Sequence, residues 1–142
     1  MNDSRVLLFT LHMPVRWCDM DAVGHVNNAT YFSYFEQARI AWLDSVGASD
    51  LVSTADNGPV AVNAAAEFLC PIVYPASLVV RVYGGAPGRS SFETYYEIDD
   101  IDNTGRRYAT GSVKLVWVDR NTGRSTPLPE RILRLLPERS LS

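Results

Sequence analysis

One stretch of the chain repeats its apolar residues at helical spacing, directly after a pair of asparagines. Asn27 and Asn28 carry the short polar side chains that cap helix N-termini. Gly47 offers the left-handed conformation that commonly ends a helix. The apolar positions between them are Tyr31, Tyr34, Phe35, Ala38, Trp42, Leu43 and Val46. The pattern predicts one long, well-buried helix, which the rest of the fold must cover.

Strand patterns flank this helix. From Pro59 onward, β-branched and aromatic residues are separated by turn signals. Within 90–99, Phe92, Thr94, Tyr96 and Ile98 alternate with polar or charged neighbours, which gives the strand one apolar and one wetter face. We expect strands at 7–17, 60–71, 77–85, 90–99 and 106–119. This order predicts an α+β fold in which one helix covers one face of an antiparallel sheet.

Length and charge exclude several classes of protein. The 142 residues suit a single domain spanning 1–142, because domains typically take roughly 100–200 residues. Thirteen Lys and Arg against 16 Asp and Glu leave a net charge of −3, so there is no basic field to hold nucleic acid. Charged residues interrupt every apolar run well short of the ~20 residues that a membrane-spanning helix needs.

The N-terminal segment and the cysteines favour a cytoplasmic protein. Residues 5–9 are apolar apart from Arg5, but Asp3 precedes them and no small-residue cleavage site follows, so we do not expect a signal peptide. Cys18 and Cys70 are expected to be reduced, buried thiols, because a chain of this size needs no disulfide. The tail 127–142 is expected to be a short helical or irregular appendage docked by Leu133, Leu135 and Leu136.

The polar run 19–28, between the first strand and the helix, is the best place for chemistry. A helix N-terminus presents free N–H groups and the positive end of the helix dipole, which together stabilise an oxyanion. Asp21, just ahead of that terminus, could attack an acyl carbon or activate water. The alternative is that the Asp, Asn and Gly residues here are ordinary turn and capping residues.

Residues 15–39 resemble the opening of hot dog fold acyl-CoA thioesterases of the 4-hydroxybenzoyl-CoA thioesterase family. The resemblance lies in Asp-x-Asp-x-x-Gly-His-Val-Asn-Asn, a following Tyr, and Glu-x-Ala-Arg at 36–39. It extends more loosely through Pro71 and 88–92 to about Trp117. It implies a long central helix wrapped by a curved antiparallel sheet, and homodimers or homotetramers with active sites at the subunit interface.

The resemblance also implies roles for residues of the polar run. It gives the catalytic carboxylate to Asp21 rather than Asp19, as nucleophile or general base, and gives the N–H groups that hold the thioester carbonyl to Asn28 and its neighbours. Asn27 and Tyr31 are expected to contact substrate. His25 matches a variant of the motif found in long-chain acyl-CoA and acyl-carrier-protein thioesterases, which argues against a hydroxybenzoyl substrate. A neutral His25 could bind the carbonyl or orient water, or it could only stabilise the turn.

Other polar residues carry weaker expectations. By resemblance Arg89, Ser90 and Ser91 would bind the nucleotide end of CoA, and a guanidinium suits a phosphate; the alternative is a solvated hairpin corner. Glu36 and Arg39 have the spacing of a weak surface ion pair, although the family pattern allows Glu36 to face the site or a partner. Glu67 is expected to face outward, with a place near the partner's site as the alternative.

The sequence thus predicts a thioester hydrolase that acts on acyl-CoA, or on acyl-carrier protein, without a cofactor. The His and Cys residues lack metal-ligand spacing, so no metal site is expected. Two alternatives stay open. One is a non-catalytic hot dog module that binds an acyl-CoA or acyl-carrier protein, and Asp21 argues against it because a binder has no need of that carboxylate. The other is a hydratase or dehydratase on the same fold, whose usual motif is not found.

Overall fold

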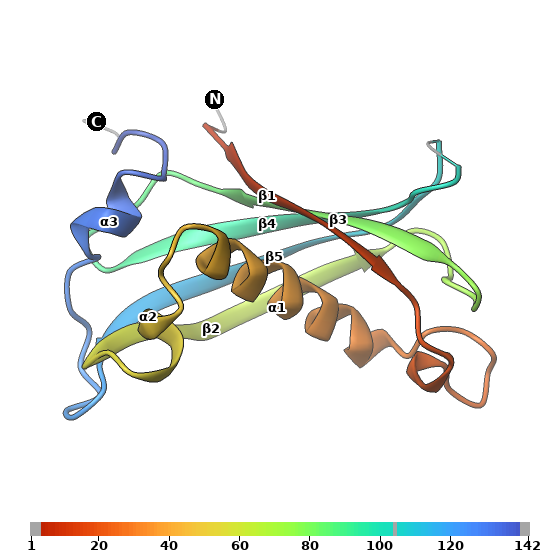
Figure 1. The fold of residues 1–142 in the computed structure, drawn as a ribbon, viewed down its shortest axis with the longest axis horizontal. Helices are drawn as coiled ribbons and strands as arrows, with labels where there is room; N and C mark the ends of the chain where they lie inside the picture. The colour runs from red at the N-terminus through yellow and green to blue at the C-terminus, as the bar shows by residue number, and fades with distance from the viewer. Residues whose placement is uncertain (1–3, 104, 140–142) are drawn as a thin grey trace.

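The computed structural model describes residues 4–103 and 105–139, which form a five-stranded antiparallel sheet and one long helix (Figure 1). The elements in chain order are β1 Val6–Pro14, η1 Trp17–Asp19, α1 Asn28–Ser45, α2 Asp50–Ser53, β2 Asn57–Phe68, β3 Ser77–Gly84, β4 Ser91–Asp100, β5 Arg107–Asp119 and α3 Glu130–Leu133. The strand order in the sheet is β1-β3-β4-β5-β2. This confirms the predicted hot dog architecture, in which α1 lies across one face of the sheet (Figure 1).

Helix α1 is the centre of the core. The predicted apolar positions are buried from Tyr31 to Leu43, as the helical spacing requires. The expectation for Val46 is wrong: it caps the helix C-terminus and is 41% exposed. Gly47 follows with a φ of +71°, the left-handed conformation that the sequence predicts for the helix stop.

The helix packs closely against the middle of the sheet. On β4, Phe92, Thr94, Tyr96 and Ile98 are all buried, which confirms the predicted apolar face. The rings of Phe35 and Tyr96 stack with centroids 4.6 Å apart. Beside them Gly111 of β5 lies directly under the Phe35 ring, and a Cβ at this position would collide with it. The absence of a side chain at Gly111 therefore lets α1 approach the sheet.

The ends of the two edge strands differ from the sequence prediction. The first strand stops at Pro14 rather than at 17, because the Asp19 carboxylate accepts the Arg16 N–H at 3.0 Å and folds Trp17–Asp19 into a 3-10 turn. Strand β2 begins at Asn57, which pairs with Asp119 at the end of β5, and it ends at Phe68 before Pro71. Long-range pairing therefore sets these limits, and the local pattern does not show it.

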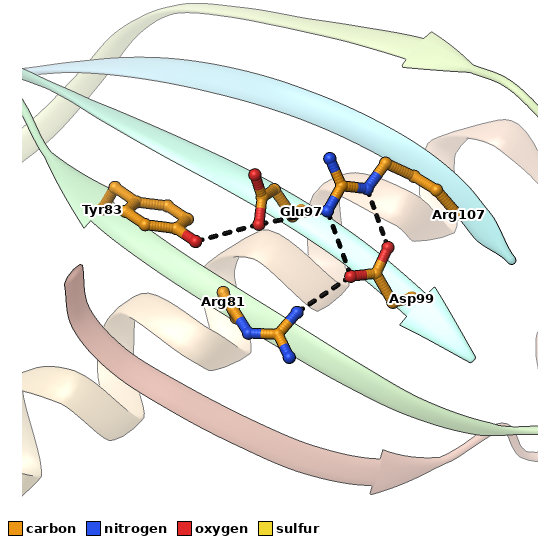
Figure 2. Close-up of polar contacts among 5 residues, drawn as sticks. All are labelled: Arg81, Tyr83, Glu97, Asp99 and Arg107. Atoms are coloured by element: carbon orange, nitrogen blue, oxygen red, sulfur yellow. Dashed lines mark hydrogen bonds and ion pairs between the residues drawn. The ribbon is translucent and has the colours of Figure 1, made fainter. Parts of the chain in front are cut away.

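The other face of the sheet is polar. Asp99 of β4 accepts hydrogen bonds from Arg107 Nε and Arg81 Nη1, both at 2.8 Å. Glu97 accepts one from the Tyr83 hydroxyl at 2.9 Å and lies 3.3 Å from Arg107 Nη2. Figure 2 shows these side chains, from three neighbouring strands, directed toward one another. Their charges are paired within the face, as expected for a surface in water.

One edge of the sheet, strand β2, carries several exposed apolar residues. Strand β2 is exposed along most of its length, and its apolar Val60, Val62 and Phe68 are 45%, 55% and 45% exposed. Exposed apolar edges of this kind tend to pair with another chain. Within the described ranges, no helix is long and apolar enough to cross a membrane.

The tail confirms one expectation and the cysteines correct another. Leu136 is buried, and Leu133 and Leu135 are partly buried against the core, as expected. Leu128 and Ile132, which the sequence analysis missed, are also buried, because the turn at α3 directs Ile132 inward. Residues 140–142 of the expected tail lie outside the described residues. Cys18 and Cys70 are free thiols, but Cys18 is exposed and Cys70 half-buried. Cys18 lies in the η1 turn, whose neighbour Trp17 is 74% exposed, so this segment stands at the surface.

Candidate active site

The loop from β1 to α1 is a tight, hydrogen-bonded turn. Met20 and Val26 form an isolated β-bridge, and inside it the Asp21 N–H donates to the His25 carbonyl at 2.9 Å. The Gly24 N–H donates to the Asp21 carbonyl at 3.0 Å, and Gly24 has a φ of +93°. Glycine adopts that conformation without strain, so Gly24 lets the chain reverse between Asp21 and the helix.

The Asp21 carboxylate is half-buried and held by two donors. Its Oδ1 accepts the Val23 N–H at 2.9 Å, and its Oδ2 accepts Asn27 Nδ2 at 3.3 Å. These two bonds fix the carboxylate at the start of α1. Because each oxygen has a further lone pair, the group can still accept a proton or attack a carbon.

Asp19, two residues earlier, has a different environment. It is 6% exposed, and its Oδ2 accepts both the Arg16 N–H and the Tyr34 hydroxyl, at 3.0 and 2.8 Å. Its Oδ1 lies 3.3 Å from Arg16 Nη2. Both carboxylates accept a hydrogen bond on each oxygen, but Asp19 is buried, whereas Asp21 is only half-buried and therefore open to a ligand.

Asn27 and Asn28 form the start of the helix, as predicted. Asn27 caps it, since its Oδ1 accepts the Ala29 N–H at 2.9 Å and its carbonyl accepts the Thr30 N–H at 2.9 Å. Asn28 is the first helical residue, so its N–H has no acceptor carbonyl within the helix. That exposed amide, at the positive end of the helix dipole, suits a developing oxyanion.

A small pocket opens beside this terminus. Its volume is about 240 Å³, and its lining includes His25, Asn28 and Tyr31 from the loop and helix, with Phe68 from the end of β2 and Cys70 from the chain after it. The Tyr31 and Phe68 rings meet edge to face, with centroids 4.9 Å apart. Burial raises the pKa of the Tyr31 hydroxyl above its ordinary value, so it stays protonated. The structure thus brings together three of the predicted site residues.

Arg89, Ser90 and Ser91 lie at the other end of the sheet. Ser91 begins β4, and Arg89 and Ser90 come just before it. This start of β4 lies near α3, opposite the β1–α1 loop (Figure 1). The Arg89 carbonyl accepts the Leu128 N–H at 3.0 Å, and Arg139 Nη2 donates to the Gly88 carbonyl at 2.9 Å. Within one chain, therefore, these residues do not meet Asp21. The C-terminal segment adds a second guanidinium here, and no local sequence signal connects Arg139 with Arg89.

The remaining candidate carboxylates lie outside the pocket beside Asp21. Glu36 makes the expected weak pair with Arg39 at 4.0 Å and lines a second cavity of about 250 Å³, between α1 and β2. Glu67 is exposed, pairs across the sheet with Thr110, and lines a cavity of about 370 Å³ on the polar face. That cavity is larger than the pocket at the helix N-terminus.

The chain matches known proteins over most of its length. A structure of the PA2801 protein, a candidate thioesterase from Pseudomonas aeruginosa, is 42% identical with a TM-score of 0.84, over 89% of this chain and 96% of that one. A candidate acyl-CoA thioesterase from Xanthomonas campestris is 36% identical with a TM-score of 0.73, over 84% and 100%. Slr0204, a 1,4-dihydroxy-2-naphthoyl-CoA thioesterase from Synechocystis, shares the fold at 22% identity with a TM-score of 0.83, over 89% and 93%.

The family model of the thioesterase-like superfamily matches residues 15–136, a range that includes the β1–α1 loop, the helix and all later strands. With this match and the shared architecture, the chain belongs to the thioesterase-like superfamily, as the motif in its polar run predicts.

Proposed function

We propose that this protein is an acyl-CoA thioesterase that uses Asp21 as its reactive carboxylate. The observation that carries the proposal is the position of Asp21, half-buried and held by Val23 and Asn27 at the N-terminus of α1. Hydrolysis of a thioester needs an attacking group and a donor to the carbonyl oxygen within reach of one carbon. Asp21 supplies the first and the Asn28 N–H the second.

The reaction consumes one water and yields a carboxylic acid and free CoA. If Asp21 acts as a base, it takes a proton from water as the water oxygen bonds to the acyl carbon, and the C–S bond then breaks. If Asp21 acts as a nucleophile, its oxygen displaces the CoA thiolate and forms an acyl anhydride, which water opens. In both cases the Asn28 N–H stabilises the oxyanion, and the thiolate leaves with a proton.

His25 and Tyr31 assist from the pocket walls, and Asn27 assists from the start of the helix. His25 lines the pocket and lies in the same turn as Asp21, where it can bind the carbonyl or orient water. Asn27 holds Asp21 through its side-chain amide, a role that adds to the substrate contact expected from the sequence. Tyr31 and Phe68 offer aromatic faces to the acyl group.

A CoA ester is the substrate class that the relatives support. The Synechocystis structure and a gentisyl-coenzyme A thioesterase both have CoA esters in their names. Arg89 and Arg139 form a positive corner that suits the phosphates of CoA. An acyl-carrier protein is less well supported, because its acidic surface would meet a chain with a net charge of −3.

The working form that we propose is a dimer paired through β2. The exposed apolar edge of β2 suits a second copy. Antiparallel β2–β2 pairing reverses the partner's sheet, so the partner's Arg89 end would lie beside this chain's Asp21 end. An extended CoA ester could then reach from the partner's Arg89 to this chain's Asp21.

The test is release of free thiol from short, long and aromatic acyl-CoAs by wild type and Asp21→Asn. We expect Asp21→Asn to fold normally and to lose at least about 100-fold in kcat, because an amide is neither nucleophile nor base. Asp44→Asn, which changes an exposed aspartate at the far end of α1, is the matched control and should keep its turnover. Wild-type turnover by Asp21→Asn would refute the role of Asp21, and binding without turnover by wild type would identify a binding module.

A further inference from the structure

A buried polar pair lies behind the candidate site, and the reaction described above does not use it. Tyr34 is 3% exposed and Asp19 6% exposed, and the Tyr34 hydroxyl donates to Asp19 Oδ2 at 2.8 Å. Burial, and then the bond to Asp19, raise the pKa of Tyr34 well above its ordinary value, so the hydroxyl keeps its proton and remains a donor. A buried donor and acceptor of this kind cost stability when one of them is removed.

Hydrogen bonds connect this pair to Asp21. The Asp19 carbonyl accepts the Asn27 N–H at 3.1 Å, and Asn27 Nδ2 donates to Asp21 Oδ2 at 3.3 Å. Tyr34 lies seven residues after Asn27, two turns into the same helix. The loop is thus tied to the body of α1 through Asp19, and Asp21 is tied to the loop through Asn27.

Resting on the proposed function, we propose that Asp19 and Tyr34 are positioning residues that set the attack geometry of Asp21. Asp21 follows an exposed turn, and Gly24 in the same loop is the kind of residue that permits movement. A reacting group displaced by about 1 Å can lose about 100-fold in rate. The Tyr34–Asp19 bond removes that freedom by holding Asn27 against the helix that also presents the Asn28 N–H.

Tyr34→Phe removes only the hydroxyl. We expect kcat to fall by about 10-fold or more and KM to stay within about twofold, because binding surfaces are unchanged and attack geometry is lost. Tyr83→Phe is the matched control. Tyr83 also donates to a carboxylate, Glu97 at 2.9 Å, but on the polar face (Figure 2). The Tyr83→Phe variant should have a lower melting temperature than wild type and an unchanged kcat.

Two substitutions of Asp19 separate geometry from charge. In Asp19→Asn the amide oxygen can occupy the place of Oδ2 and accept hydrogen bonds from both the Arg16 N–H and the Tyr34 hydroxyl. We therefore expect kcat to fall by about threefold at most. Asp19→Ala removes the acceptor of the Tyr34 hydroxyl, so kcat should fall by as much as in Tyr34→Phe. If Asp19→Asn instead loses as much as Asp21→Asn, Asp19 is a reacting carboxylate and the proposal is overturned.

The double variant Tyr34→Phe/Asp21→Asn tests whether Tyr34 acts through Asp21. If it does, loss of the hydroxyl adds nothing to the residual turnover of Asp21→Asn, measured at high enzyme concentration. An equal fold-loss in both backgrounds would show a purely structural bond and overturn the proposal. A Tyr34→Phe enzyme with wild-type kcat would do the same. Failure of the proposed function is a separate outcome, because it appears as turnover that Asp21→Asn retains.

Discussion

The two ends of the sheet carry the two groups of residues that the proposed function needs together. One end holds Asp21 and the helix N-terminus beside a small aromatic pocket, and the other holds Arg89 on an open corner. Ser91 pairs with Val116 and Ile98 with Ala109, so the seven steps along β4 from Ser91 to Ile98 separate the two ends by about 23 Å. Within a single chain, the proposed reactive carboxylate and the proposed phosphate-binding arginine are thus too far apart to form one compact site.

Breaking the β2 edge is the strongest test of whether the two ends meet across a dimer. Val60→Lys/Val62→Lys places charges on the exposed edge and should give monomers by light scattering. We expect at least about 100-fold lower turnover, because the Asp21 end then lacks the partner that orients the CoA ester. Val52→Lys, which changes an exposed valine on α2, is the control and should stay a dimer. Fully active monomers would place the whole site in one chain.

Removing the Arg89 guanidinium should raise KM for acyl-CoA more than it lowers kcat. We expect Arg89→Ala to raise KM for acyl-CoA by about tenfold, the loss typical of a charge-assisted hydrogen bond, and to leave kcat unchanged. A thioester of a short thiol without the nucleotide should show no change in KM. Equal effects on both esters would remove Arg89 from CoA binding.

Coexpression of Arg89→Ala with Asp21→Asn sharpens that prediction. If Arg89 serves the partner's Asp21, half of the dimers are mixed and each has one intact site of two, so about one quarter of wild-type activity returns at low substrate. If Arg89 serves its own chain, mixed dimers have no intact site and nothing returns beyond the activities of the parents.

The smallest expected effect concerns stability at high pH. Both tyrosine–aspartate pairs, Tyr34 with Asp19 and Tyr108 with Asp100, lie near the Asp21 end. Burial and the bond to Asp100 raise the pKa of Tyr108 to about 12, and the pKa of Tyr34 is raised as well. A raised pKa in the folded state means that the stabilisation is present below the ordinary value near 10 and is lost as pH rises above it.

The melting temperature should therefore fall by several degrees between about pH 10 and 12. Tyr34→Phe has one titrating group fewer, so its melting temperature should fall less over the same pH range. Its melting temperature at neutral pH should be lower than that of wild type, because the hydrogen bond to Asp19 is lost. A parallel fall in wild type and Tyr34→Phe would show that Tyr34 does not contribute to the alkaline loss.

The sequence predicts the helix well and the distant pairings poorly. The helical spacing of the apolar residues, the Asn27 cap and the Gly47 stop of α1 are all local signals. The polar run that contains Asp21 is a local signal as well. The role of Asp19 depends on Tyr34, which the sequence presents only as an apolar helix position. The start of β2 depends on its register with β5, and the gap between Arg89 and Asp21 depends on the length of the sheet. None of these follows from neighbouring residues alone.

The close contact of Phe35 with Gly111 has a consequence for motion. The helix meets the middle of the sheet at a position where β5 has no side chain to yield, and Tyr96 stacks on the same ring. Helix α1 cannot open without exposing the centre of the core, so its amides near Phe35 should exchange with solvent only when the whole sheet unfolds. The part of α1 around Phe35 therefore belongs to the slowest-opening part of the molecule, whereas the loop that carries Asp21, ahead of Asn28, is at its surface.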